Sequence, residues 1–488
     1  MLQFVLGRAG SGKTEYLRRL LADRSLSGLD STVMVVPEQY TFETEKAMLR
    51  LAGPVRGNAI PVYSFTRLAE AVFRKEGGAV GRRLSDGGRR ILMASAIEAC
   101  QDRLEVYAAA AKSGRVTDVM LTAVNEMKMC GISPEELGHT ARDLGGSGLG
   151  KKLSELSLLY HTYDALVAAS YLDSRDDLTR LSQALETSSF FEGCTVAVDS
   201  FEGFTAQEVA VLTQIMRRAD QVIVSLCTDG LDHTGTGLFA LVDRTLHRLS
   251  AAAAENGVSV QPPVMLTGAP RFQNENLKLV EAQLFCAGET MTSPDHEGIT
   301  VFEARDPYEE AEFAAATIRR LVTQEGWRYR DFSIICRSPE RYYGCLDAAL
   351  KKRDIPCFVS QPARVDGEPV TRFVLGAFEA VLGGYPTEAL LEMLKTGVSG
   401  FTAEEISSLE NYAYLWKIGG TGWRQEFVRH PQGFGKEFTP EDTQELARLN
   451  QLRQRLIGPL ERFAARTKDS TGSGISQAAY MMLMAYGM

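Results

Sequence analysis

The chain has 488 residues, of which 44% are hydrophobic and 24% are charged, and its formal net charge is −9. This composition is typical of a globular protein of roughly three or four domains, and no stretch approaches the ~18 uninterrupted apolar residues of a membrane span. The short apolar start is not typical of a signal peptide, so we expect a cytoplasmic protein with no membrane partner.

The negative charge argues against a protein coated in basic surface, but it leaves room for DNA held in a local positive channel. The eight cysteines are scattered, with no CxxC pair and no zinc-ligand spacing. We interpret them as buried free thiols rather than metal ligands.

The first predicted element is a strand over Leu2–Leu6, and it leads through a glycine loop into a helical pattern. The loop matches the pattern GxxxxGK[ST] between strand and helix, where its backbone N–H groups and the helix dipole can bind phosphates. Lys13 would reach the β- and γ-phosphates and the Thr14 hydroxyl would bind Mg²⁺. We therefore predict an ATP site formed by Gly7, Arg8, Ala9, Gly10, Ser11, Gly12, Lys13 and Thr14.

The next predicted strands cover Val33–Val36 and Ile60–Tyr63, and the second leads into the helical pattern SFTRLAEAVF. Alternation of strands and helices favours a parallel α/β sheet. Between these strands the loop PEQYTFETE carries Tyr40, Thr41 and Phe42, which could stack on bases and hydrogen-bond the phosphates of single-stranded DNA. Packing of these aromatic rings in a core is the equal alternative.

Strand signals stop over residues 77–189, which we predict to be a helical insertion, and return at Thr195–Val198 and Gln221–Leu226. Asp199, at the end of the first of these strands, is placed to hold the metal ion of a nucleotide site. A hydrolase usually carries a second acid beside it, but here Ser200 follows. Glu202 is the nearest candidate for a base that activates water, although an exposed loop glutamate is the more common reading.

A second α/β unit is predicted from residue 294, with strands at Ile299–Phe302 and Phe332–Cys336. Arg337, after the second strand, could reach the γ-phosphate of a nucleotide held by the first lobe, or could be an ordinary surface arginine. Beyond residue 374 the chain is again mainly helical. We predict a first lobe of residues 1–76 and 190–293, the insertion 77–189, the start of a second lobe at 294–374, and a helical insertion at 375–488 that is cut short.

The order of GRAGSGKT, VPEQYTFETE, VYSFTRLAEAVF, AVDSFEGFTAQE and the segment around DFSIICRSPERY resembles the amino-terminal portion of the AddB family, which forms the B subunit of ATP-dependent helicase/deoxyribonucleases. The resemblance spans nearly the whole chain. It implies a superfamily 1 helicase fold, in which two RecA-like phosphate-loop lobes with parallel sheets carry large helical insertions.

The resemblance also implies a function. In this family the B subunit pairs with a motor partner, the A subunit of the same enzyme, and handles single- and double-stranded DNA. The heterodimer resects double-strand breaks under Chi control before homologous recombination. The family member binds ATP without being the motor, and it carries a 5′–3′ exonuclease with a 4Fe–4S cluster in a carboxy-terminal region that lies beyond this chain. The alternatives are an active superfamily 1 translocase that uses Glu202, and a small-molecule kinase, which the two-unit layout disfavours.

Overall fold

The computed structural model describes residues 1–27, 31–78, 80–111, 116–230, 237–285, 292–293, 295–358 and 365–488. The chain divides into two compact units, residues 1–302 and residues 303–488, and each is described by itself. Within the described ranges, no helix combines the length and the apolar composition needed to cross a bilayer.

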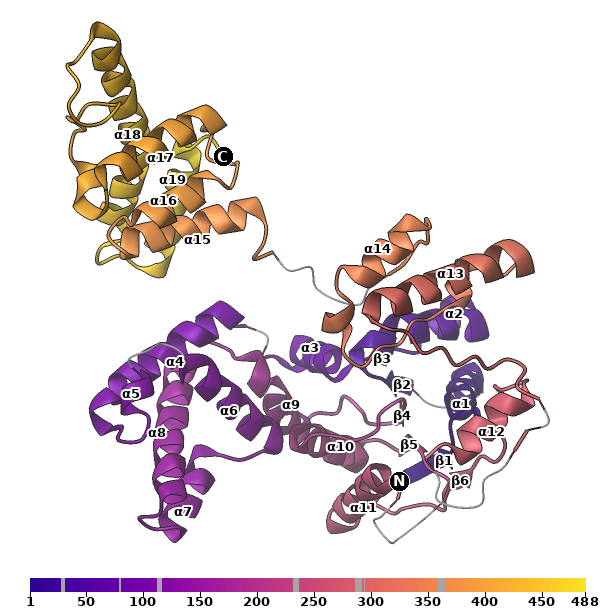
Figure 1. Cartoon of the computed structure of the whole chain (residues 1–488). Helices are drawn as coiled ribbons and strands as arrows, with labels where there is room; N and C mark the ends of the chain where they lie inside the picture. Colours follow the sequence, from indigo (N-terminus) through magenta and orange to yellow (C-terminus); the bar gives the residue numbers. More distant parts are fainter. Residues whose placement is uncertain are drawn as a thin grey trace. The chain divides into compact units, whose positions relative to one another are not determined.

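The first unit is built on a parallel sheet, which confirms the α/β prediction (Figure 1). Its order in the described chain is β3-β2-β4-β5-β1-β6, and in the register Leu2 lies opposite Val222 and Ser31 opposite Cys194. Because all strands run in one direction, their carboxyl ends share one edge, where ligands bind in sheets of this kind. The strands are β1 (Leu2–Gly7), β2 (Ser31–Val35), β3 (Val62–Tyr63), β4 (Cys194–Val198), β5 (Gln221–Cys227) and β6 (Val264–Met265).

Helices cover both faces of this sheet, so its strands are apolar on both sides. On β1, Leu2, Phe4 and Leu6 face one core, whereas Val5 faces the other. One face packs on α1 (Lys13–Ser27) and α2 (Thr41–Gly57). The other packs on α3 (Phe65–Glu76), α9 (Asp177–Leu185), α10 (Ala206–Arg218) and α11 (Ala240–Glu255), and α12 (Glu275–Gln283) follows β6.

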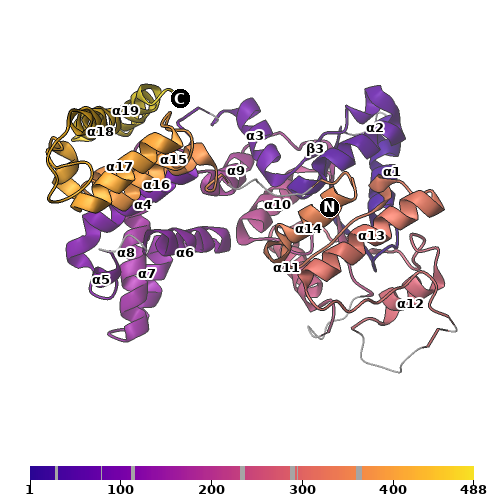
Figure 2. The same cartoon turned by 45° about the horizontal axis from the view of Figure 1, so that its top comes forward.

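Between α3 and α9, the described residues form helices and one isolated bridge but no strand, and Figure 2 shows α4 to α8 gathered in one group. They enclose their own apolar core around Met93, Val124 and Tyr163. Serine side chains cap several of these helices, which satisfies backbone N–H groups of the first turn. The elements are α4 (Asp86–Cys100), η2 (Gln101–Arg103), α5 (Ala108–Ala111), α6 (Val116–Cys130), α7 (Pro134–Asp143), α8 (Gly148–Ala168) and η3 (Ser174–Asp176).

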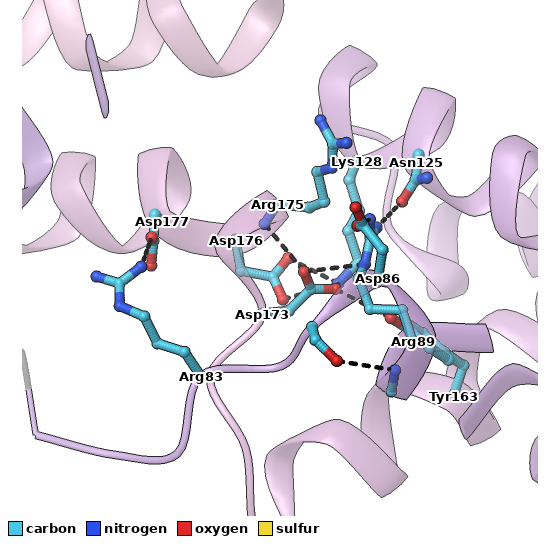
Figure 3. A network of polar contacts seen from close by, with 12 residues as sticks. Arg83, Asp86, Arg89, Asn125, Lys128, Tyr163, Asp173, Arg175, Asp176 and Asp177 are labelled. Atoms are coloured by element: carbon cyan, nitrogen blue, oxygen red, sulfur yellow. Dashed lines mark hydrogen bonds and ion pairs between the residues drawn. The ribbon is translucent and has the colours of Figure 1, made fainter. Parts of the chain in front are cut away.

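A buried polar network joins these helices to η3, immediately before α9 (Figure 3). Asp173 is fully buried, and its carboxylate accepts hydrogen bonds from Tyr163 Oη at 3.0 Å and from the backbone N–H of Arg175 at 3.0 Å. The guanidinium of Arg89, on α4, lies 3.3 Å from the same carboxylate. These contacts connect α4 and α8 to η3, the turn directly before α9, which packs on the sheet of the first unit.

Lys128, on α6, is the second buried cation of this network. Its ammonium lies 2.7 Å from Asp176, 2.9 Å from Asp164 and 3.8 Å from Asp173. Burial disfavours the charged form, but the carboxylates of Asp176 and Asp164 outweigh it and raise the pKa of Lys128. The side chain therefore stays charged inside the protein and draws three acidic side chains together.

The second unit begins with two helices, α13 (Pro307–Glu325) and α14 (Cys345–Lys352), which pack on each other. The prediction of strands at Ile299–Phe302 and Phe332–Cys336 is wrong, because no strand is present in either segment. A strand needs a neighbour to satisfy its backbone, and neither segment has one within the described ranges. Val301 and Ile335 are both 93% exposed. The two 3₁₀ turns of this part are η4 (Tyr329–Asp331) and η5 (Pro339–Tyr342).

From residue 369 onward the second unit is helical and encloses a core around the fully buried Trp423. The indole N–H of Trp423 donates to Thr387 Oγ1 at 3.0 Å, which satisfies its polar atom inside the core. The elements are α15 (Pro369–Leu382), α16 (Thr387–Leu394), α17 (Ala403–Trp416), η6 (Gly420–Arg424), α18 (Pro440–Thr467) and α19 (Gly472–Ala485).

Candidate nucleotide-binding site

The loop Gly7–Thr14, called the phosphate loop below, runs from the end of β1 into α1. Gly10 and Gly12 have φ values of 77° and 93°, which are open to glycine but strained for other residues. The backbone N–H of Tyr16 donates to the carbonyl of Gly12 at 2.9 Å and closes the first turn of the helix. The loop therefore stands at a helix amino terminus, where backbone N–H groups favour an anion.

Lys13 lies folded into the phosphate loop. Its ammonium donates hydrogen bonds to the carbonyl oxygens of Gly7 at 2.6 Å and Arg8 at 2.9 Å. Burial lowers the pKa of Lys13, and the nearby carboxylate of Asp199 opposes that effect. The side chain is thus held over the loop by weak neutral acceptors that a phosphate oxygen could replace.

Asp199 directly follows β4, and β5 lies between that strand and β1. Its buried carboxylate accepts hydrogen bonds from Ser225 Oγ on β5 and from Ser200 Oγ at 3.2 Å. Asp199 and Lys13 therefore share the carboxyl edge of the sheet and interact electrostatically.

The residues present fit a nucleotide with Mg²⁺. Ser11 is only 7% exposed, and its hydroxyl has no hydrogen-bond partner in the described chain, so a buried polar atom is left for a ligand. Mg²⁺ keeps several waters and takes few protein ligands beside substrate phosphates. Thr14, in the first turn of α1, and Asp199 are the residues predicted to hold it, and the ion would neutralise phosphate charge there.

The second acid expected beside Asp199 has no equivalent in the turn that follows β4. Ser200 stands there with a φ of 67°, an uncommon conformation for a residue with a side chain. Glu202 is exposed and lines a hollow of about 400 Å³ with Phe204 and Arg244. No hydrogen bond or ion pair joins its carboxylate to the phosphate loop among the residues described.

Arg8 belongs to the phosphate loop, but its side chain contacts residues outside the loop. Its guanidinium lies 3.0 Å from Glu281 on α12 and 3.5 Å from Asp229 after β5, and its Cζ lies 5.4 Å from the ring centroid of Phe239. These contacts of Arg8 were not predicted from the sequence, and neither were β6 and α12. The short apolar run Val264–Leu266, ended by Gly268, was the available signal.

The three residues predicted to contact DNA lie beyond the carboxyl end of β2, in η1 (Glu38–Tyr40) and the first turn of α2. Tyr40 and Phe42 expose their rings, and Lys46 Nζ lies 5.7 Å from the Phe42 ring centroid. Thr41 is buried, and its hydroxyl donates to the carbonyl of Glu38 at 2.9 Å. Only the two aromatic side chains are therefore presented to solvent.

Arg337 lies in the second unit, where it lines a hollow of about 340 Å³ with Glu310 and Tyr342. In the described ranges no three His, Cys, Asp or Glu side chains gather as metal ligands, and the seven cysteines found there are free thiols. Only three of those thiols are buried. Cys286 lies outside the described residues.

Comparison with known proteins shows the family to which this chain belongs. The sequence model described as "ADDB, N-terminal" matches residues 4–281, more than half of the chain. A protein of Thermoanaerobacter sp. (strain X514), named as the B subunit of an "ATP-dependent helicase/deoxyribonuclease", is 32% identical over 470 residues, or 95% of this chain and 41% of the relative.

Proteins with the same name from Acetivibrio thermocellus and Clostridium perfringens are each 28% identical, over 477 and 480 residues. Each match covers 96% of this chain and 42% of the relative. The chain therefore spans less than half the length of the curated relatives it matches.

Proposed function

Because the chain belongs to the AddB amino-terminal family, we propose that it is the ATP-binding, DNA-handling part of a helicase–nuclease subunit that processes DNA double-strand breaks for homologous recombination. The observation that carries the proposal is that Lys13, in the phosphate loop after β1, and Asp199, directly after β4, lie at the same edge of the parallel sheet. In phosphate-loop proteins these residue types bind the polyphosphate and its metal ion.

The site supports binding of ATP more than its turnover. A carboxylate next to the metal-binding aspartate would position or activate the attacking water, but Ser200 occupies that position and donates its hydroxyl to Asp199. No hydrogen bond or ion pair links the Glu202 carboxylate to the phosphate loop within the described chain. We infer that this protein contributes little or no motor activity of its own and that ATP acts mainly as a bound ligand.

DNA would be held at the same edge of the sheet, where Tyr40 and Phe42 are exposed. Aromatic stacking tolerates any base sequence, which suits the single-stranded part of the single- and double-stranded DNA that the protein would handle. The relatives are named as B subunits, which supports a heterodimer whose other member is the helicase/nuclease A subunit of the same enzyme. Control of resection by Chi sequences belongs to the same proposal.

We assign the 5′–3′ exonuclease and the 4Fe–4S cluster to a region outside this chain. The cysteines described here do not gather into a ligand set. The purified chain is therefore expected to leave DNA intact in the presence of Mg²⁺ or Mn²⁺. Metal-dependent cleavage by this chain would contradict that assignment.

The central experiment titrates labelled ATP and labelled single-stranded DNA into the wild-type chain and Lys13→Ala, with hydrolysis measured in parallel. We expect Lys13→Ala to lose at least tenfold in ATP affinity and to keep its affinity for DNA. If Lys13→Ala bound ATP as well as the wild type, the site assignment would fail.

The same assay separates the alternatives. Strong DNA-stimulated hydrolysis that disappears in Glu202→Gln would identify an active translocase. Phosphate transfer to a metabolite without affinity for DNA would identify a small-molecule kinase.

A further inference from the structure

The segment Gly268–Asn274, between β6 and α12, crosses the phosphate loop closely. The backbone N–H of Arg271 donates to the carbonyl of Gly10 at 3.3 Å. A Cβ added to Gly10 would lie 2.8 Å from a ring carbon of Phe272 and 3.2 Å from the Cβ of Arg271. The contact leaves no space for a side chain between the two segments, so the position of Arg271 relative to the loop is set by packing.

Arg271 brings a second cation to the phosphate loop, in addition to Lys13. The guanidinium of Arg271 lies close enough to the Lys13 ammonium for the two charges to interact, and the carboxylates of Asp199 and Glu281 also interact with that ammonium. Arg271 is exposed, and within the described chain no carboxylate lies at ion-pair distance from it. Like charges placed together repel each other, and a bound anion would relieve that repulsion.

The side-chain contacts of Arg8, in the same loop, differ from those of Arg271. Its guanidinium is neutralised by Glu281 and Asp229 and is packed against Phe239. Arg271 has none of these contacts, although it lies against the same loop. The unpartnered hydroxyl of the buried Ser11 is a second, independent sign that the loop is built around a ligand with oxygen acceptors.

We propose that Arg271 binds the polyphosphate of a nucleoside di- or triphosphate in the phosphate loop and supplies from the first unit itself a positive charge that complements Lys13. The inference rests on the proposed function, because it assumes that the loop holds such a nucleotide. Arg271 is a binding residue in this scheme, and its contribution does not require an arginine from the second unit. It should act on ligands with two or three phosphates and not on a monophosphate.

The test measures the affinities of the whole purified chain for ATP, ADP and AMP with Mg²⁺, in wild type, Arg271→Ala, Arg271→Lys and Lys13→Ala. Arg142→Ala is the matched control, because it removes an exposed arginine from α7, outside the sheet lobe. Thermal unfolding of each variant checks that it is folded. We expect Arg271→Ala to weaken ATP and ADP binding by about ten- to a hundredfold, as for a charge-assisted hydrogen bond, and AMP binding by less than twofold. Arg271→Lys should recover most of the affinity.

The possible failures are distinguishable. If Arg271→Ala bound ATP like Arg142→Ala while Lys13→Ala lost binding, the role of Arg271 would be refuted and the nucleotide site would stand. Equal losses for ATP and AMP would also refute a polyphosphate contact. If the wild type bound no nucleotide, the proposed function would fall and this inference with it.

Discussion

Replacing Asp173 by asparagine tests whether the buried network holds the helices α4 to α8 on the sheet lobe. The change keeps the shape of the side chain but removes a fully buried negative charge between Arg89 and Lys128. The two buried cations, Arg89 and Lys128, then lose a negative counter-charge. The N–H₂ group of the asparagine must also face one of the groups that now donate a hydrogen bond to the carboxylate. The perturbation is therefore electrostatic and leaves the apolar core unchanged.

The structure sets the expected magnitude. Removing one partner of a buried ion pair costs about 3–5 kcal/mol, because the remaining charge stays buried without compensation. Asp164 and Asp176 still face Lys128, but both are about one-third exposed, so they compensate only in part. A loss of about 3–5 kcal/mol corresponds to a fall in the melting temperature of the first unit of ~6–20 °C, at about 2–4 °C per kcal/mol.

The measurement is differential scanning calorimetry of the whole chain, with Asp118→Asn as the matched control. Asp118 lies 2.6 Å from Arg90 and joins the same two helices, α4 and α6, but the two side chains are 58% and 61% exposed. An exposed pair of this kind contributes about 0–1 kcal/mol. If Asp173→Asn and Asp118→Asn shifted the melting temperature equally, the network would not be the anchor described here.

Three further predictions concern the site. Gly10→Ala and Gly145→Ala both force alanine into a positive φ, at about 1–2 kcal/mol, but only Gly10 faces a ring at 2.8 Å. ATP titration should therefore show at least a tenfold loss for Gly10→Ala and none for Gly145→Ala; equal affinities would contradict the packing. Because burial lowers the pKa of Lys13 and phosphate favours the ammonium, ATP binding should take up protons at alkaline pH and weaken as pH rises. Calorimetry in two buffers of different ionisation enthalpy measures this, and proton release would refute it. Phe42→Ala should weaken single-stranded DNA binding about 5- to 100-fold by loss of stacking, whereas Val55→Ala, also exposed on α2, should leave it unchanged in a fluorescence anisotropy assay; equal effects would show that Phe42 has no special role.

Local patterns were enough to predict the first strand, the loop and the helix of the first unit. The run Leu2–Leu6, the glycine loop and the helical spacing of Leu17 and Leu21 are all contained in one short stretch, and the structure has them as β1, the phosphate loop and α1. The same holds for Asp199 at the end of β4, because an acid after a buried strand stands out in sequence.

Features that depend on a distant partner could not be predicted in this way. Ile299–Phe302 and Phe332–Cys336 have the composition of strands, but a strand exists only where another one pairs with it. Lys128 and Asp173 are 45 positions apart and neither stands out in its own segment, although together they form a buried ion pair. Arg271 likewise lies in a loop, and only the fold brings it to Gly10.

The position of β1 inside the sheet has a consequence for biosynthesis. Its neighbours, β5 and β6, come about 210 and 260 residues later in the chain. At about 5–20 residues per second, a ribosome needs roughly 10–40 seconds to make β5 after it has made β1. The phosphate loop is thus translated well before the strands β5 and β6, which complete its surroundings. We therefore expect the chain to bind nucleotide only after the whole first unit has folded, and not at an early step of its folding.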